Sequence, residues 1–120
     1  MNTKICTSIE QSEKLLSLGL EPGTADMFYV TEIGTLVAES PYDVEGCEPC
    51  VPFVPAWSLT ALLELMPLYN GTTPRLSWCK GLYTCFYYQG KMISNPNSMV
   101  DAAFEMVCWL IEQEHIKVNK

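Results

Sequence analysis

Six cysteines and one histidine are the residues of this 120-residue chain whose types could bind a metal or act as nucleophiles. Cys47 and Cys50 form a C-x-x-C pair in the segment GCEPCVPFVP. A structural zinc ion needs four ligands, usually two such pairs or one pair with histidines. The other spaced pair, Cys79 and Cys85, falls in predicted strands, where alternation is expected to send both to one face, and His115 lies far along the chain. Cys47 and Cys50 are therefore weak metal candidates, and we predict no cofactor.

A redox or catalytic cysteine needs surroundings that lower the pKa of its thiol, or a base within reach. A thioredoxin-like pair begins at a helix N-terminus, whereas prolines follow Cys50 and the next predicted helix starts only at Ser58. Cys108 and His115 share a helix face, but their separation of seven positions spans about 10 Å at 1.5 Å each. No G-x-S-x-G, P-loop, G-x-G-x-x-G or H-E-x-x-H motif occurs. We therefore predict that the protein is not an enzyme.

Prolines recur at every third position through Pro49, Pro52 and Pro55, which is the period of polyproline II. A P-x-x-P ligand usually needs a neighbouring basic anchor, and this segment is acidic. Its carboxylates also match no EF-hand spacing. The segment 40–56 is therefore predicted to be a stiff connector that delivers Trp57 to the start of a helix.

Apolar periodicity and turn signals divide the chain into helices and strands. We predict three helices, each opened by a serine N-cap: 9–18, a helix from Ser58 that Pro67 stops, and 98–115. We predict strands at 27–33 and 35–39 and a three-stranded meander over 75–81, 82–90 and 91–94. This order predicts an α+β fold, in one domain over 1–120. We expect an antiparallel sheet of three to five strands with about three helices packed on it, as two layers or as an α/β/α sandwich.

The last predicted helix is apolar over most of its circumference. Asp101, Glu105 and Glu112 fall in one narrow stripe that we expect to be solvated, and nearly all other positions are apolar. Such a helix cannot lie on a sheet with its back in water. We expect it to be covered on more than one side, by another helix or by a second subunit.

Aromatic side chains concentrate in the meander and in the last helix. Trp78, Tyr83, Tyr87 and Trp109 are the partner-binding candidates, because aromatic residues are enriched at protein interfaces. Aromatic sheet faces also stack nucleic-acid bases, but a net charge of −7 with no basic stripe argues against nucleic acid as the partner.

The same charge and the hydropathy pattern bear on location. No apolar run approaches the roughly 20 residues that span a bilayer, and the N-terminal segment has no apolar signal core. An acidic surface also disfavours anionic membranes. We therefore expect a cytoplasmic protein that does not bind membranes, with its cysteines as free thiols.

Four stretches, KICTSIEQSEKLLSLGL, TADMFYV, VPAWSLTALLELMP and NPNSMVDAAFEMVCWLIEQ, resemble a family of small uncharacterised proteins encoded by phages and prophages of gut Bacteroides-type bacteria. The layout is also similar, more loosely, to phage ABA-sandwich domains, in which a sheet lies between helices. The resemblance covers most of the chain outside 34–50, and it assigns no activity to any residue. It implies a small accessory protein in the cytoplasm of the bacterial host.

Three functional hypotheses follow. The preferred one is a non-enzymatic accessory module of phage or prophage type that forms a homo-oligomer or binds an unidentified host or phage protein. The first alternative is an acidic effector that binds a host protein or imitates the charge of nucleic acid. The second is a small zinc protein whose ligands include Cys47 and Cys50.

Overall fold

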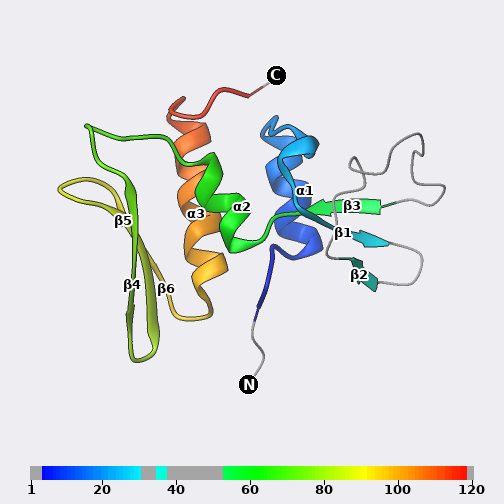
Figure 1. Ribbon diagram of the computed structural model, residues 1–120, viewed down its shortest axis with the longest axis horizontal. Helices are drawn as coiled ribbons and strands as arrows, with labels where there is room; N and C mark the ends of the chain where they lie inside the picture. The colour runs from blue at the N-terminus through cyan, green and yellow to red at the C-terminus, as the bar shows by residue number, and fades with distance from the viewer. Residues whose placement is uncertain (1–3, 31–34, 38–52, 119–120) are drawn as a thin grey trace.

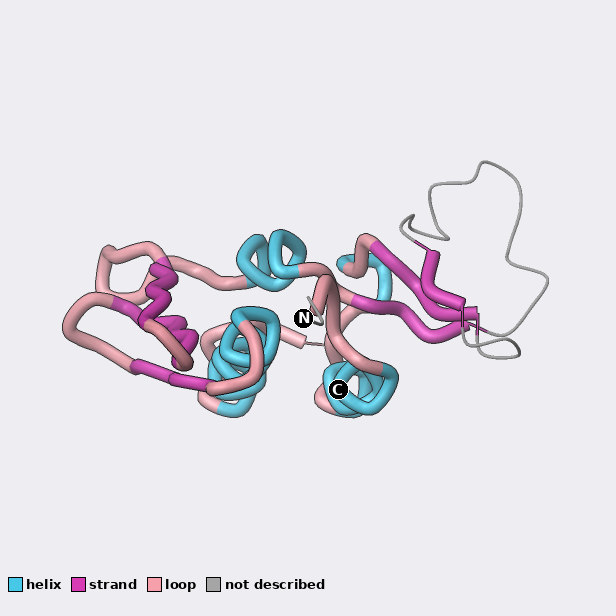
Figure 2. Tube along the Cα trace, turned by 90° about the horizontal axis from the view of Figure 1, so that it is seen from below, coloured by secondary structure: helices cyan, strands magenta, loops and turns pink. Residues whose placement is uncertain are grey.

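A computed structural model describes residues 4–30, 35–37 and 53–118 of the chain. Figures 1 and 2 show helices in the middle of the molecule and one sheet at each end. The predicted α+β class, with helices packed on antiparallel strands, is confirmed. The elements in chain order are α1 (Ile9–Ser17), the 3-10 turn η1 (Pro22–Thr24), β1 (Met27–Val30), β2 (Thr35–Val37), β3 (Phe53–Ala56), α2 (Leu59–Leu65), β4 (Pro74–Cys79), β5 (Leu82–Tyr87), β6 (Met92–Asn95) and α3 (Met99–Glu112).

The strands do not join into one sheet. They form two three-stranded antiparallel sheets, which we call the first sheet (order β2-β1-β3) and the second sheet (order β4-β5-β6). Helices α2 and α3 pack against each other, α3 packs on the second sheet, and α1 contacts β3 of the first sheet. The helices therefore lie between the two sheets, and α3 buries the apolar side of the second sheet.

The three serines that were predicted to open helices all act as N-caps. The side chains of Ser8, Ser58 and Ser98 each accept a hydrogen bond from the backbone N–H three residues further on. Gln11 completes a capping box in α1, because its Oε1 accepts the backbone N–H of Ser8 at 3.0 Å. Helix α3 ends at Glu112, three residues before the predicted end.

The second sheet is the predicted meander. A two-residue turn joins β4 to β5, where Cys79 pairs with Leu82 and Gly81 adopts φ +82°. Such a positive φ favours glycine, which has no Cβ to clash with the backbone. A slightly longer reversal joins β5 to β6, where the N–H of Tyr87 donates to the carbonyl of Lys91 at 2.9 Å.

Strand β3 was not predicted. The prolines of 40–56 predict a connector, but residues 53–56 pair with β1, from Val30↔Phe53 to Met27↔Ala56. A proline in a strand cannot donate a ladder hydrogen bond, so it is tolerated only at an edge. Pro55 meets that condition because β3 is an edge strand of the first sheet. The rest of the connector, including Pro49 and Pro52, lies outside the described residues.

Helix α3 is covered on more than one side, as expected. Phe104 is 8% exposed, and Val107 and Leu110 are fully buried within the single chain. The cover comes from α2 on one side and from β5 and β6 on another. A second subunit is therefore not needed to bury this helix, so the helix gives no argument for self-association.

The predicted polar stripe of α3 is only partly solvated. Glu105 and Glu112 are exposed, whereas Asp101 is 8% exposed. Asp101 turns inward because Lys4, from the segment before α1, reaches it with an Nζ–Oδ1 distance of 2.7 Å. The expectation that Asp101 faces solvent was wrong, since helical periodicity does not reveal a cation supplied from the other end of the chain.

A small second core lies beside the first sheet. Cys6, Met27 and Ala56 are buried together, and Tyr29 packs against them. This cluster is separate from the main core, which joins α1, α2, α3 and the second sheet. Across the described residues, none of the helices has both the length and the apolar character needed to span a bilayer.

Candidate functional site

Strand β4, one edge of the second sheet, carries large apolar side chains that the helices do not cover. The pairing of β4 with β5 places Leu76 beside Cys85 and Trp78 beside Tyr83 on one face. Cys85 is fully buried on that face, so it is the face that packs against α3. Trp78 is nevertheless 63% exposed and Leu76 is 36% exposed. We call Leu76 and Trp78 the overhang, because β4 extends beyond the helix layer that covers β5 and β6.

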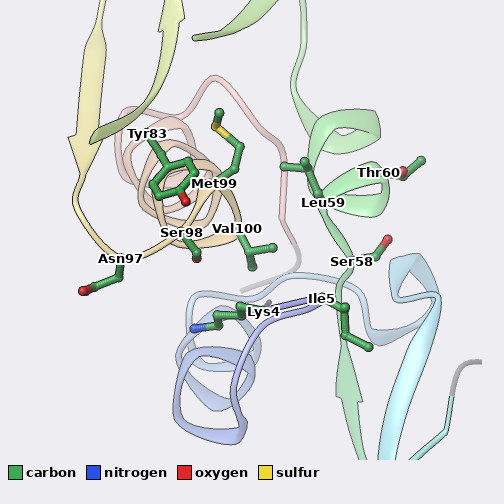
Figure 3. Close-up of a pocket in the computed structure, with 10 residues that line it drawn as sticks. All are labelled: Lys4, Ile5, Ser58, Leu59, Thr60, Tyr83, Asn97, Ser98, Met99 and Val100. Atoms are coloured by element: carbon green, nitrogen blue, oxygen red, sulfur yellow. The ribbon is translucent and has the colours of Figure 1, made fainter. Parts of the chain in front are cut away.

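A hollow of about 480 Å³ lies next to the overhang, between the first turns of α2 and α3. Figure 3 shows Tyr83 and Met99 on one side of it, Leu59 on the other, and Lys4 and Ile5 along the bottom. Tyr83 lines the hollow and is also the cross-strand neighbour of Trp78. The hollow and the overhang therefore form one surface that is mainly apolar. The lining residues are Lys4, Ile5, Ser58, Leu59, Thr60, Tyr83, Asn97, Ser98, Met99 and Val100.

Beneath the hollow, Lys4 and Asp101 are held in a closed polar network. Lys4 Nζ donates to Asp101 Oδ1 and to Gln11 Oε1, both at 2.7 Å. Gln11 Nε2 donates to the same Asp101 oxygen at 2.6 Å, and Ser98 Oγ donates to Oδ2 at 2.6 Å. Because the polar groups already bind one another, the network stabilises the contact between the N-terminal segment and α3.

The electrostatics of Asp101 fit this structural role. Burial alone would raise the pKa of its carboxyl group. The hydrogen bonds from Lys4, Ser98 and Gln11, together with the charge of Lys4, outweigh that effect and hold the pKa below its ordinary value. Asp101 is therefore ionised at neutral pH, and it is not poised to donate a proton.

Of the four aromatic candidates, the structure brings two together. Trp78 belongs to the overhang and Tyr83 lines the hollow beside it. Tyr87 is 1% exposed, and its hydroxyl donates to the carbonyl of Pro67 at 2.7 Å. Burial raises the pKa of Tyr87 to about 12. Tyr87 is thus part of the core and does not present its ring to a partner.

Trp109 lies in a separate aromatic cluster near the end of α3. Its ring centroid is 6.1 Å from that of Tyr69 and 5.6 Å from that of His115, and Lys91 Nζ lies 5.4 Å from the Trp109 centroid. The ring is half-buried by these neighbours. The cluster ties the loops around β5 and α2 to the end of α3, which is a packing role.

Of the four described thiols, three are buried and kept protonated, and one is exposed. Burial raises the pKa of Cys85 and of Cys108 to about 11, and it also raises the pKa of Cys6. Cys79 is exposed, on the face opposite to buried Cys85. The expectation that Cys79 and Cys85 share a face was wrong, because the two-residue turn pairs Cys79 with Leu82 and sets the alternation of β5.

Metal ligands cannot be assigned in the described part of the chain. Within those residues, no three histidine, cysteine, aspartate or glutamate side chains come together in a way that could hold an ion. Cys47 and Cys50 lie outside the described residues. The weak metal candidates therefore stay a prediction.

Comparison with known proteins returned no family model, no curated protein and no solved structure that matches this chain. The resemblance to phage and prophage proteins stays a prediction for that reason. Function must be inferred from the geometry of the overhang and the hollow. Trp78 and Tyr83 were predicted from the sequence, whereas Ile5, Leu59 and Met99 were not, because their proximity depends on how the helices dock and leaves no local signal.

Proposed function

We propose that this chain is a small non-catalytic accessory protein of phage or prophage type, and that it acts by binding another protein chain through the overhang and the hollow. The observation that carries the proposal is Trp78, which is 63% exposed although it lies on the helix-facing side of its sheet. A tryptophan on that side of a sheet is ordinarily buried. Here it is left uncovered at the edge of an apolar hollow.

Several features of the surface are those of a protein interface. Interface cores are enriched in tryptophan and tyrosine and depleted in charge, and binding energy concentrates in such aromatic anchors beside pockets. Trp78 and Tyr83 supply the aromatic anchors, and Leu59 and Met99 supply apolar walls. Lys4, the charged residue of the lining, is already paired with Asp101. The surface therefore favours a mainly apolar protein partner.

The absence of catalysis is part of the proposal and has its own support. A nucleophilic cysteine requires a lowered pKa, whereas burial raises the pKa of Cys6, Cys85 and Cys108. The ring of His115 lies against Tyr69, with centroids 5.1 Å apart. In none of its described contacts does it act as a base for a thiol. The polar groups at the floor of the hollow bind one another.

The two alternatives have no observation in their favour. Imitation of nucleic-acid charge requires carboxylates gathered on one face, and no such gathering is seen among the described ones, which are spread over the three helices and the segments between and after them, as Glu10, Asp26 and Glu114 illustrate. A zinc protein depends on Cys47 and Cys50, which the structure does not describe. We therefore keep protein binding as the proposed function.

Photo-crosslinking in living cells tests the proposal. A benzophenone amino acid replaces Trp78 in one variant and Met92 in a control; both side chains are 63% exposed and both lie on edge strands of the second sheet. We expect a discrete protein adduct from position 78 on irradiation and none, or far less, from position 92. Equal adducts from both positions, or none from position 78, would contradict the proposal.

A further inference from the structure

We infer that the chain bound at this surface is a second copy of the protein, joined through β4 as an antiparallel pair whose two-fold axis passes through Ser77. The inference rests on the proposed function and adds the identity of the partner and the register of pairing. It follows from the backbone groups that β4 leaves unpaired, the side chains beside them, and the symmetry of the short sequence Leu76-Ser77-Trp78.

The direction of the backbone groups in β4 follows from the neighbouring strands. The N–H of Tyr87 donates to Lys91, so alternation turns the backbone groups of Tyr83, Cys85 and Tyr87 toward β6. The intervening residues of β5 therefore bond β4, where their partners are Arg75, Ser77 and Cys79. The backbone N–H and C=O groups of Leu76 and Trp78 point out of the sheet, at its open edge.

These outward groups complement a second copy of themselves. In an antiparallel pair centred on Ser77, Leu76 of each copy lies opposite Trp78 of the other, and each pair exchanges both of its backbone hydrogen bonds. A two-fold at Leu76 would instead place Trp78 opposite Pro74, which has no N–H to donate. A two-fold at Trp78 would place Leu76 opposite Lys80, which lies beyond the end of β4. The register centred on Ser77 is therefore the one that pairs Leu76 with Trp78 inside the strand.

The side chains fit the same register. Leu76 and Trp78 of both copies fall on the helix-facing side, where each pair covers apolar surface left bare in the single chain. Ser77 meets its own copy on the other face at a close, non-hydrogen-bonded position, where a small side chain is accommodated. Arg75 lies opposite Cys79, so no two like charges are directly opposed.

The spacing of the layers agrees with this arrangement. Two adjacent strands occupy about 10 Å, which is also the spacing of packed helices. In the dimer, the two β4 strands would lie side by side between the helix layer of one copy and the helix layer of the other. They would hold these layers about one helix width apart, and the paired Trp78 rings would fill the gap. The hollow beside Tyr83 would lie at the same boundary.

The helix-facing side of β4 also lacks the features that keep edge strands apart, and the charge of Arg75 lies on the other face. Natural proteins protect such edges with inward-pointing charges, bulges or prolines within the strand. The register of β4 is continuous from Pro74 to Cys79, its helix-facing side carries Leu76 and Trp78, and its proline is at the first position. The opposite edge, β6, is a shorter strand that Pro96 follows directly.

Engineered disulfides test the register. Ser77→Cys in a Cys79→Ser background places two thiols at a non-hydrogen-bonded pair, where Cα atoms lie about 4.5 Å apart, within disulfide range. The control is Ser94→Cys in the same background, which puts an exposed thiol on β6. We expect mild oxidation to give a reducible covalent dimer with Ser77→Cys at least tenfold faster than with Ser94→Cys. Equal rates would overturn the inference.

Light scattering with size-exclusion chromatography tests the association itself. We expect the wild type to have the mass of a dimer at high concentration, Trp78→Lys to be a monomer, and Met92→Lys to remain a dimer. Circular dichroism of each variant verifies that it is folded. A monomeric wild type at the highest soluble concentration, or a Trp78→Lys variant that is folded and still dimeric, would overturn the inference.

The two proposals fail in different ways. An adduct at position 78 between two copies of the chain supports both of them. An adduct with a different protein, together with a monomeric wild type, supports the proposed function and overturns the homodimer. No adduct at position 78 and a monomeric wild type overturn both.

Discussion

The two sheets of this molecule are attached to the same helices by different physical means. The second sheet lies on α3 through a broad apolar contact in which Cys85 and Tyr87 are buried. The first sheet buries far less apolar surface. It is attached through hydrogen bonds of Thr7, a fully buried polar residue just before α1. Large apolar contacts give stability without strict direction, whereas buried hydrogen bonds specify direction and are costly to leave unpaired.

Thr7 is bonded through its backbone and its side chain. Its N–H donates to the carbonyl of Trp57 at 2.9 Å, and its Oγ1 accepts the N–H of Trp57 at 3.0 Å. Its Oγ1 also lies 2.8 Å from Ser12 Oγ, and its carbonyl accepts the hydroxyl of Tyr29 at 2.9 Å. Thr7 thus connects β1, α1 and the residue that directly follows β3. Truncation of buried apolar side chains is therefore expected to destabilise the second sheet more than the first. Substitution of polar side chains is expected to weaken the first sheet and its connections.

The largest expected effect is a cavity in the main core. Leu110→Ala should lower the free energy of unfolding by about 2–5 kcal/mol, because Leu110 is fully buried and its neighbours cannot all collapse into the space. Met27→Ala, in the small core beside the first sheet, should cost near the lower end of that range, about 2 kcal/mol. Urea denaturation measured by tryptophan fluorescence gives both values. Equal losses would show that the small core is as important as the main one.

A smaller effect is expected where the two halves of the molecule are linked. Asp101→Ala leaves the partly buried Lys4 ammonium without its carboxylate, so the free energy of unfolding should fall by about 1–3 kcal/mol. Glu112→Ala, an exposed site on the same helix, is the matched control and should change stability little. A Glu112→Ala variant that loses as much as Asp101→Ala would contradict this account.

The contribution of Asp101 also depends on pH, with a definite sign. Its folded-state pKa lies below the ordinary value of 3.8, so the stabilisation is complete above that value and is lost as pH falls through the folded pKa. Acidification below about pH 4 should therefore destabilise the wild type more than Asp101→Ala. Denaturation curves measured from neutral pH downward test this, and parallel curves for the two proteins would contradict it.

The smallest effects come from two tyrosines that tie one sheet each to a backbone carbonyl. Tyr29→Phe removes the bond to Thr7 and Tyr87→Phe removes the bond to Pro67, and each should cost about 0.5–1.5 kcal/mol. Hydrogen exchange localises the change. Tyr29→Phe should speed exchange in β1 and β3, and Tyr87→Phe should speed it in β5 and β6. Faster exchange in the opposite sheet would contradict the division of the molecule into two parts.

Local signals in the sequence predicted the elements that depend on neighbouring residues. Ser8 with Gln11 predicted the start of α1, and Ser98 predicted the start of α3, because capping bonds close within one turn. The meander was predicted from the alternation of its strand formers and from its turns. Strand β3 was missed because Pro55 disfavours strands in general, and only its position at an edge makes it acceptable.

The sequence by itself determined the α+β class, the helix starts and the need to cover α3, since these follow from periodicity and from bonds between residues close in the chain. Only the tertiary structure decided that the strands form two sheets, and that Asp101 pairs with Lys4, 97 positions away. It also decided that α3 covers β5 and β6 but leaves Trp78 bare. The physical reason is that these outcomes depend on how packed elements dock, and docking is set by the sum of many weak long-range contacts.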